Sequence, residues 1–242
     1  MRSAARTITS VALAISFGLA SRCVLVAQSA APEAMSSSAK PAEVSFQFER
    51  AGVPVPRFTL RVNEDGTGSY QADEVQSPAD KDSVQYASPK HIDRTLKLTA
   101  PTVMKIFKGA RELGHFDMSC ETKSKHIANT GEKTLSYKGA DGTGSCTYNY
   151  SDNKDVNGLT DTFLFIAFTL DEGRRLEFLH RYDRLGLDEE MNELVQAVKA
   201  GHALELGTIA PVLISIAGDG AVMQRVRLQA TKLLEQAESN KI

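Results

Sequence analysis

The sequence is poor in aromatic residues and lacks any dense cluster of positive charge. It has no tryptophan, aromatic residues make up 7% of its 242 positions, and its formal net charge is −2 at pH 7. Nucleic acids and anionic membrane surfaces are bound by clustered lysine and arginine, so we expect neither as a partner. After the N-terminus, the most apolar run is residues 163–170, which is too short to span a membrane and predicts a buried helix. We therefore expect no membrane insertion of the mature chain.

Motifs of the common enzyme and metal-binding classes are also missing. The sequence contains no G-x-G-x-x-G, Walker A, HExxH or G-x-S-x-G pattern. Its five histidines show no short ligand spacing; they are His91, His115, His126, His180 and His202. Residues 153–158 match the first six positions of a calcium loop, but position 12, which needs a glutamate, is Leu164. We expect no catalytic, cofactor-binding or metal-binding residues, and no cofactor.

The N-terminal segment has the organisation of a signal peptide. Two arginines precede an apolar stretch, residues 7–20, and small residues follow at 27–31. We predict a signal peptide over residues 1–31, cleaved near Ser29 or Ala31, and hence a periplasmic or secreted protein. Cleavage removes three arginines and no acidic residue, which leaves the mature chain with a formal net charge of −5.

Two alternative interpretations of the N-terminus stay open. One is a lipid anchor on Cys23, although Arg22 stands where a lipoprotein signal needs a small residue. The other is an uncleaved signal that serves as a membrane anchor. The following residues, 32–42, are rich in alanine and serine and lack a periodic apolar pattern, which predicts a flexible linker.

Two cysteines remain after the signal peptide, Cys120 and Cys146. An exported chain is expected to oxidise such a pair. Closing a loop of this length stabilises a fold by about 3–4 kcal/mol in the chain-entropy model. Free thiols are the alternative, whereas zinc is disfavoured because no C-x-x-C or paired histidine spacing accompanies the two cysteines. We predict a Cys120–Cys146 disulfide across a β-hairpin.

Residues 43–150 predict an antiparallel sheet with one packed helix. Apolar and polar residues alternate in several short runs, which is typical of half-buried strands; the apolar positions include Val44, Phe46, Phe48, Phe58, Leu60, Val62, Leu96 and Leu98. Asp65-Gly66 between two such runs predicts a hairpin turn. Thr99 is a candidate N-cap for an amphipathic helix to Leu113, and a second turn is expected at residues 141–144 before Tyr148 and Tyr150.

Residues 151–242 predict helices, either packed on the sheet or forming a small subdomain. A long apolar stripe runs from Leu159 to Leu179, and Gly173 within it predicts a kink or a split into two helices. Three later helices are predicted, each with its own N-cap. Asp188 would cap a helix over 189–202, and Thr208 would cap a helix with Pro211 in its first turn. Asp219 would cap the last helix. The predicted fold class is therefore α+β, with a disulfide-stapled hairpin and a C-terminal helical segment.

Two weak resemblances accompany this pattern. The motifs G-x-P-x-P, D-G-T-G-x-Y and the amphipathic helix within residues 43–113 resemble the opening of an uncharacterised family of exported bacterial domains of unknown function. That resemblance implies an α+β domain in the cell envelope and no catalytic residues. Residues 209–237 resemble a single HEAT-like repeat, through V-R-x-x-A-x-x-L after Asp219. Such repeats need about three copies to bury a core, so an ordinary helical hairpin is the alternative.

The expected function is that of a non-enzymatic binding or scaffolding module of the bacterial cell envelope. Its partner would be another envelope protein, and the sequence leaves the oligomeric state undetermined. Two alternatives stay open: an envelope hydrolase whose active site the sequence does not reveal, and a membrane-anchored accessory factor. Converging acids or histidines in a pocket would favour the hydrolase.

Overall fold

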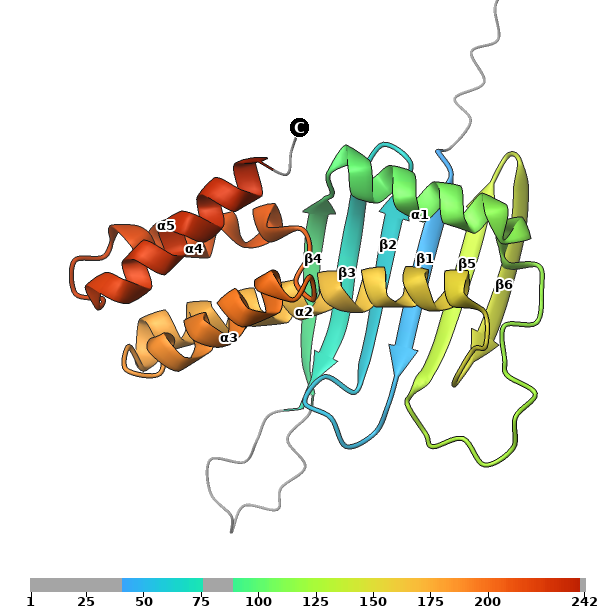
Figure 1. Ribbon diagram of the computed structural model, residues 1–242, viewed down its shortest axis with the longest axis horizontal. Helices are drawn as coiled ribbons and strands as arrows, with labels where there is room; N and C mark the ends of the chain where they lie inside the picture. Colours follow the sequence, from blue (N-terminus) through green and yellow to red (C-terminus); the bar gives the residue numbers. More distant parts are fainter. Residues whose placement is uncertain (1–40, 76–88, 240–242) are drawn as a thin grey trace, which may run out of the picture. The chain divides into compact units, whose positions relative to one another are not determined.

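The computed structural model describes residues 41–75 and 89–239, so the predicted signal peptide and nearly all of the predicted linker lie outside the described residues. Six antiparallel strands form one sheet in the order β4-β3-β2-β1-β5-β6 (Figure 1). The strands are β1 Glu43–Glu49, β2 Arg57–Asn63, β3 Thr67–Glu74, β4 Lys90–Lys97, β5 Glu132–Gly139 and β6 Gly142–Tyr148. The helices are α1 Ala100–Glu112, α2 Lys154–Tyr182, α3 Leu187–Lys199, α4 Ala210–Gly218 and α5 Gln224–Ser239. This arrangement confirms the predicted α+β class.

Alternation of side chains gives the sheet one apolar and one polar face. In β2, Phe58, Leu60 and Val62 are buried, whereas the residues between them are partly exposed. The predicted Asp65-Gly66 turn joins β2 to β3, and Gly66 adopts φ +83°, a conformation that glycine accepts without strain. On the polar face, hydroxyl groups pair across β5 and β6, with 2.8 Å between Ser136 Oγ and Ser145 Oγ.

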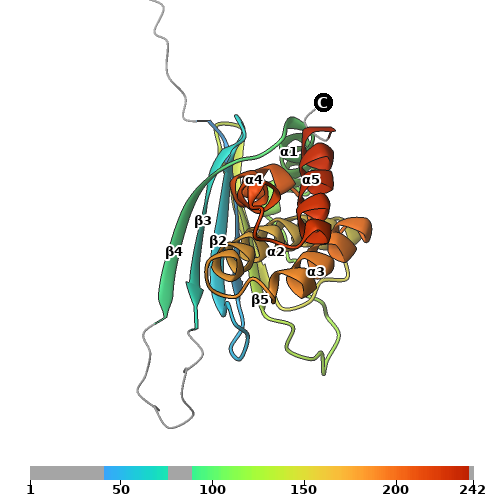
Figure 2. The ribbon, with the colours of Figure 1, turned by 90° about the vertical axis from the view of Figure 1, so that its left-hand side faces the viewer.

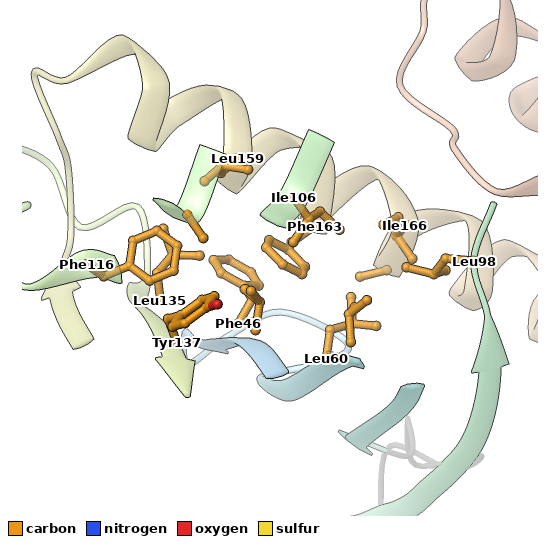
Figure 3. Packing of buried hydrophobic residues seen from close by; sticks show 14 of the residues in the cluster. Phe46, Leu60, Leu98, Ile106, Phe116, Leu135, Tyr137, Leu159, Phe163 and Ile166 are labelled. Atoms are coloured by element: carbon orange, nitrogen blue, oxygen red, sulfur yellow. The ribbon is translucent and has the colours of Figure 1, made fainter. Parts of the chain in front are cut away.

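The helices α1 and α2 cover the apolar face, as Figure 2 shows from the side. Between them and the sheet lies a core in which Phe46 and Phe163 stack with ring centroids 5.2 Å apart. Figure 3 shows these rings together with Leu60, Ile106 and Leu135, all of which are fully buried. The core therefore fixes the first half of α2 on the sheet.

The second half of α2 packs instead against α3, α4 and α5. Their core contains Leu176, Leu187, Met191, Leu213 and Val226, all fully buried. Polar contacts also join the sheet side to the helical segment, since Thr99 Oγ1 donates to Glu205 Oε1 at 2.7 Å. One helix thus belongs to both cores. None of the helices in the described ranges, 41–75 and 89–239, has the length and apolar character that crossing a membrane requires.

The predicted disulfide joins Cys120 to Cys146, with the two Cα atoms 5.7 Å apart. It links the segment after α1 to the edge strand β6 and indicates an oxidising, non-cytoplasmic compartment. The backbone of residues 115–117, which precede Cys120, packs so closely on Gly144 that a Cβ atom at this position would collide with it. The β5–β6 turn is tighter than predicted, because β6 already starts at Gly142. This strand ends at Tyr148, and Tyr150 beyond it is exposed.

Several predicted helix boundaries are wrong. Gly173 neither kinks nor splits α2, which runs unbroken for 29 residues; the glycine instead lets Ile209 approach the helix closely. Asp188 lies inside α3, one residue after its start, and its carboxylate accepts from Arg225. Asp219 ends α4 rather than starting α5. Thr208 precedes α4 by two residues, and its hydroxyl donates to the Glu205 carbonyl.

Candidate binding surface

The C-terminal end of α2 carries an unusual group of exposed apolar side chains. Phe178 is 60% exposed, Tyr182 is 68% exposed, and Leu185 in the following turn is 82% exposed. Phe178 and Tyr182 are four residues apart and so lie on one face of the helix, with their ring centroids 5.0 Å apart. We call Phe178, Tyr182 and Leu185 the apolar tip. Neither Phe178 nor Tyr182 is among the residues that α2 buries, which include Leu176.

Hydrogen bonds fix the backbone around the apolar tip. The turn after α2 is closed by Gly186 N, which donates to Asp183 Oδ1 at 3.2 Å. The next residue, Leu187, is fully buried and starts α3. The backbone that carries the aromatic pair is therefore already ordered in the free protein, so binding a partner would not require the ordering of this helix end.

The opposite side of the same helix end is tied to α4. His180 Nε2 lies 2.9 Å from Asp219 Oδ2, and Arg184 Nη2 lies 3.3 Å from the same oxygen. Hydrogen bonds from the Ala221 backbone amide and from His180 lower the pKa of Asp219 below its usual range. This carboxylate stays ionised and holds α2 against α4.

Ser215 completes a serine–histidine–aspartate group by residue type, with its Oγ 3.5 Å from His180 Nδ1. Such a group supports acyl transfer only where backbone N–H groups can stabilise an oxyanion. Ser215 is the sixth residue of α4, where backbone N–H groups are already bonded to carbonyls four residues earlier. The arrangement therefore ties α2 to α4, and α4 itself offers no free N–H group for an oxyanion beside Ser215.

Arginine and tyrosine at the apolar tip have the chemistry of interface hot spots. The Arg181 guanidinium carbon lies 5.9 Å from the centroid of the Tyr182 ring. Tyrosine, tryptophan and arginine dominate the energetics of protein interfaces because they bury large, rigid surfaces with a polar group at one end. This end of α2 can bind an apolar or aromatic side chain of another protein.

A second polar cluster lies where α1 meets the β5–β6 turn. Tyr137 donates to Asp141 Oδ1 at 2.6 Å, and Arg111 Nε donates to Asp141 Oδ2 at 2.8 Å. These two hydrogen bonds keep the pKa of Asp141 well below its usual range. His115 lies beside the cluster with φ 60°, a left-handed conformation that is rare outside glycine. Because the charges compensate one another, this cluster holds α1 to the hairpin.

A groove of about 560 Å³ lies at the far end of the hairpin. Its lining includes Glu49, Arg50, Glu121, Ile127 and Asn149. The loop that forms one wall is anchored by the buried amine of Lys133, which donates to the carbonyls of Gly131 and Asn149 at 2.8 Å each. Burial lowers the pKa of Lys133. The groove is polar and open, without the apolar lining of a typical small-molecule site.

Three glutamates could hold a metal ion: Glu172 on α2, with Glu190 and Glu193 on α3.

Residues 153–158, which match the first half of a calcium loop, do not form a loop in the structure. The helix α2 begins at Lys154, and Asn153 caps it by accepting from the Asp155 amide at 2.8 Å.

The five histidines, all of them in the described ranges, lie in separate places. His91 pairs with Asp73, His115 lies near Asp141, and His180 pairs with Asp219, while His202 stacks near Phe165 and His126 stands alone in a left-handed conformation. The predicted site residues, Cys120 and Cys146, meet in the disulfide.

Sequence analysis missed the apolar tip, although it had a signal. Phe178 and Tyr182 fall outside the apolar stripe of the long helix, so their exposure follows from helical geometry. Comparison with known proteins adds no assignment: no family model matches this chain, and no curated protein is found to be similar to it.

Proposed function

We propose that this protein is an exported, non-enzymatic binding module of the bacterial cell envelope and that its partner is another envelope protein. The observation that carries the proposal is the apolar tip, Phe178, Tyr182 and Leu185, on a rigid helix end. Exposed apolar patches on soluble domains are a sign of interaction sites. The side chains here are 60–82% exposed, whereas comparable residues elsewhere on α2, such as Phe163 and Leu170, are fully buried.

The disulfide supports an extracytoplasmic location, and the sequence of residues 1–31 supports export by a cleaved signal peptide. The binding role is also supported by the rigid presentation of the tip. Asp219 fixes one side of the helix end and Asp183 closes the turn on the other. A binding site that is already ordered in the free protein loses less entropy on association.

The experiment uses a double variant, Phe178→Ser with Tyr182→Ser. Both side chains are exposed, so the variant is expected to keep its fold, as circular dichroism and thermal unfolding will show. The tagged full-length protein is expressed in its source organism, and partners that co-purify from the envelope fraction are identified. The affinity of the recovered partner is then measured by calorimetry with wild type and variant.

The matched control replaces two other exposed apolar residues, Ile214→Ser and Leu228→Ser, which are 60% and 54% exposed. Because hot-spot truncations cost about 2 kcal/mol or more each, the tip variant should bind at least about thirtyfold more weakly, while the control keeps wild-type affinity. Equal affinity of the tip variant and wild type, or an equal loss in the control, would show that the tip is not the binding surface.

A further inference from the structure

Three glutamates from two helices converge at the α2–α3 interface. Glu172 of α2 is 2% exposed and Glu190 of α3 is 6% exposed. Glu193 lies three residues after Glu190, and hence on the same face of α3, but it is open to solvent. One carboxylate oxygen from each of the three lies within 4.8 Å of the other two. Two buried acids and one exposed acid therefore share one small space.

Buried oxygens in this cluster lack partners. Among the described residues, Glu172 Oε2 and Glu190 Oε1 accept no hydrogen bond, although both atoms are buried. The nearby cation is Arg175, whose Nη1 lies 3.3 Å from Glu172 Oε1. Its Nε lies 2.9 Å from Glu190 Oε1, but without the direction of a hydrogen bond. Glu190 Oε1 is thus paired in charge by Arg175, whereas Glu172 Oε2 is buried without a partner, which is costly. Three acids beside one arginine leave the cluster with room for a further cation.

We propose that Glu172, Glu190 and Glu193 form a binding site for a divalent cation of the calcium class. Calcium binds oxygen ligands at about 2.3–2.6 Å, so oxygens on opposite sides of the ion lie up to about 4.6–5.2 Å apart. The three oxygens lie within 4.8 Å of one another, which is close enough for all of them to contact one calcium ion. Magnesium demands near-octahedral geometry, keeps several of its waters and usually takes only one or two protein carboxylates, so a cluster of three favours calcium.

The surroundings can supply the rest of the coordination. Glu193 faces solvent, so water molecules can complete the shell from that side. The side chain of Arg175 is 55% exposed, and it can therefore move into solvent when an ion takes its place. In the absence of an ion, burial and the neighbouring Glu190 raise the pKa of Glu172 to about 8, so a proton is the competing occupant. This proposal is independent of the apolar tip and its partner.

The test is chemical unfolding of the full-length protein at pH 7 in EDTA, and in calcium chloride up to about 10 mM. Sites with few charged ligands in exported modules bind calcium with Kd on the order of 10⁻⁴–10⁻³ M. At about ten times Kd, the unfolding equilibrium constant should fall about tenfold. Magnesium chloride at the same concentration should have a smaller effect.

Glu193→Gln replaces a charged carboxylate by a neutral amide at an exposed position, so the variant keeps its fold, and the weaker ligand is expected to abolish the calcium effect in this concentration range. The matched control is Glu189→Gln, an exposed glutamate of the same helix outside the cluster, which should keep it. No calcium effect in wild type would overturn the proposal, and so would an effect that survives Glu193→Gln or disappears in Glu189→Gln. The cluster would then be occupied by a shared proton and Arg175 alone.

Discussion

The two glycines in the long helix α2 respond in opposite directions to the same substitution. Gly173 is buried, and an added Cβ atom would lie 3.0 Å from Ile209 Cβ and still closer to its Cγ2. Overpacking of this kind costs about 1–3 kcal/mol. Alanine recovers about 1 kcal/mol of helix propensity relative to glycine. We therefore expect Gly173→Ala to lower the free energy of unfolding by up to about 2 kcal/mol.

Gly158 supplies the matched control within the same helix. No atom lies within 4 Å of the position that its Cβ would occupy. Gly158→Ala therefore gains the higher helix propensity of alanine without a collision. It should raise the free energy of unfolding by up to about 1 kcal/mol. Because both variants gain the same helix propensity, they should differ by the overpacking cost alone, about 1–3 kcal/mol.

Urea unfolding followed by circular dichroism measures both variants. The double variant Gly173→Ala with Ile209→Ala tests the cause, because the new methyl group partly fills the space that the isoleucine leaves. Ile209→Ala alone is expected to cost about 2–5 kcal/mol, and it should cost less in the Gly173→Ala background. If both glycine variants are equally stabilised, or if the Gly173 and Ile209 substitutions are additive, the close contact between Gly173 and Ile209 is refuted.

Three further predictions concern the disulfide, the buried acid and the N-terminus. Replacing Cys120 and Cys146 by alanine should lower the free energy of unfolding by about 3–4 kcal/mol in non-reducing urea titrations; an unchanged midpoint would contradict this. The raised pKa of Glu172 means that its contribution to stability is fully present below the unfolded pKa and is lost as the pH rises toward about 8. In EDTA, the stability of wild type relative to Glu172→Gln should therefore fall between pH 5 and 9, and a constant difference would argue against it. Intact mass of the exported protein should show cleavage near Ser29 or Ala31 and a mass two hydrogens below the reduced form, whereas a lipid on the N-terminal fragment would indicate an anchor.

Local sequence patterns were enough to predict the sheet and its first helix. Alternation identified strands through Phe46 and Leu60, and Asp65-Gly66 predicted the turn between β2 and β3. Thr99 correctly marked the start of α1, although its side chain makes no capping hydrogen bond. Strand alternation, hairpin turns and helix starts are set by residues close together in the sequence, so local patterns are enough to predict them.

Predictions that depended on distant contacts failed. Asp188 and Asp219 were expected to cap helices, but they pair with Arg225 and His180, which are distant in the sequence. Thr208 instead donates to the nearby Glu205 carbonyl. A capping residue and a residue of a tertiary ion pair look alike in sequence. Gly173 was expected to break the helix for the same reason, since the approach of Ile209 is visible only in three dimensions.

The candidate sites were even less accessible to sequence analysis. The apolar tip could have been found, because Phe178 and Tyr182 lie off the buried stripe of α2. The glutamate cluster could not, because Glu172 and Glu190 are 18 residues apart and approach only through the turn between α2 and α3. Glutamates on helices are usually exposed, so nothing in the sequence indicated that Glu172 and Glu190 are buried.

The most direct test of the proposed function is photocrosslinking in living cells. A photoreactive amino acid is placed at Tyr182, and in a second strain at Gln47, which is exposed on the polar face of the sheet. We predict one discrete crosslinked product from position 182 and none from position 47, and the product should disappear when Phe178→Ser is added. No product from position 182, or an equal product from both positions, would contradict a partner-binding role for the apolar tip.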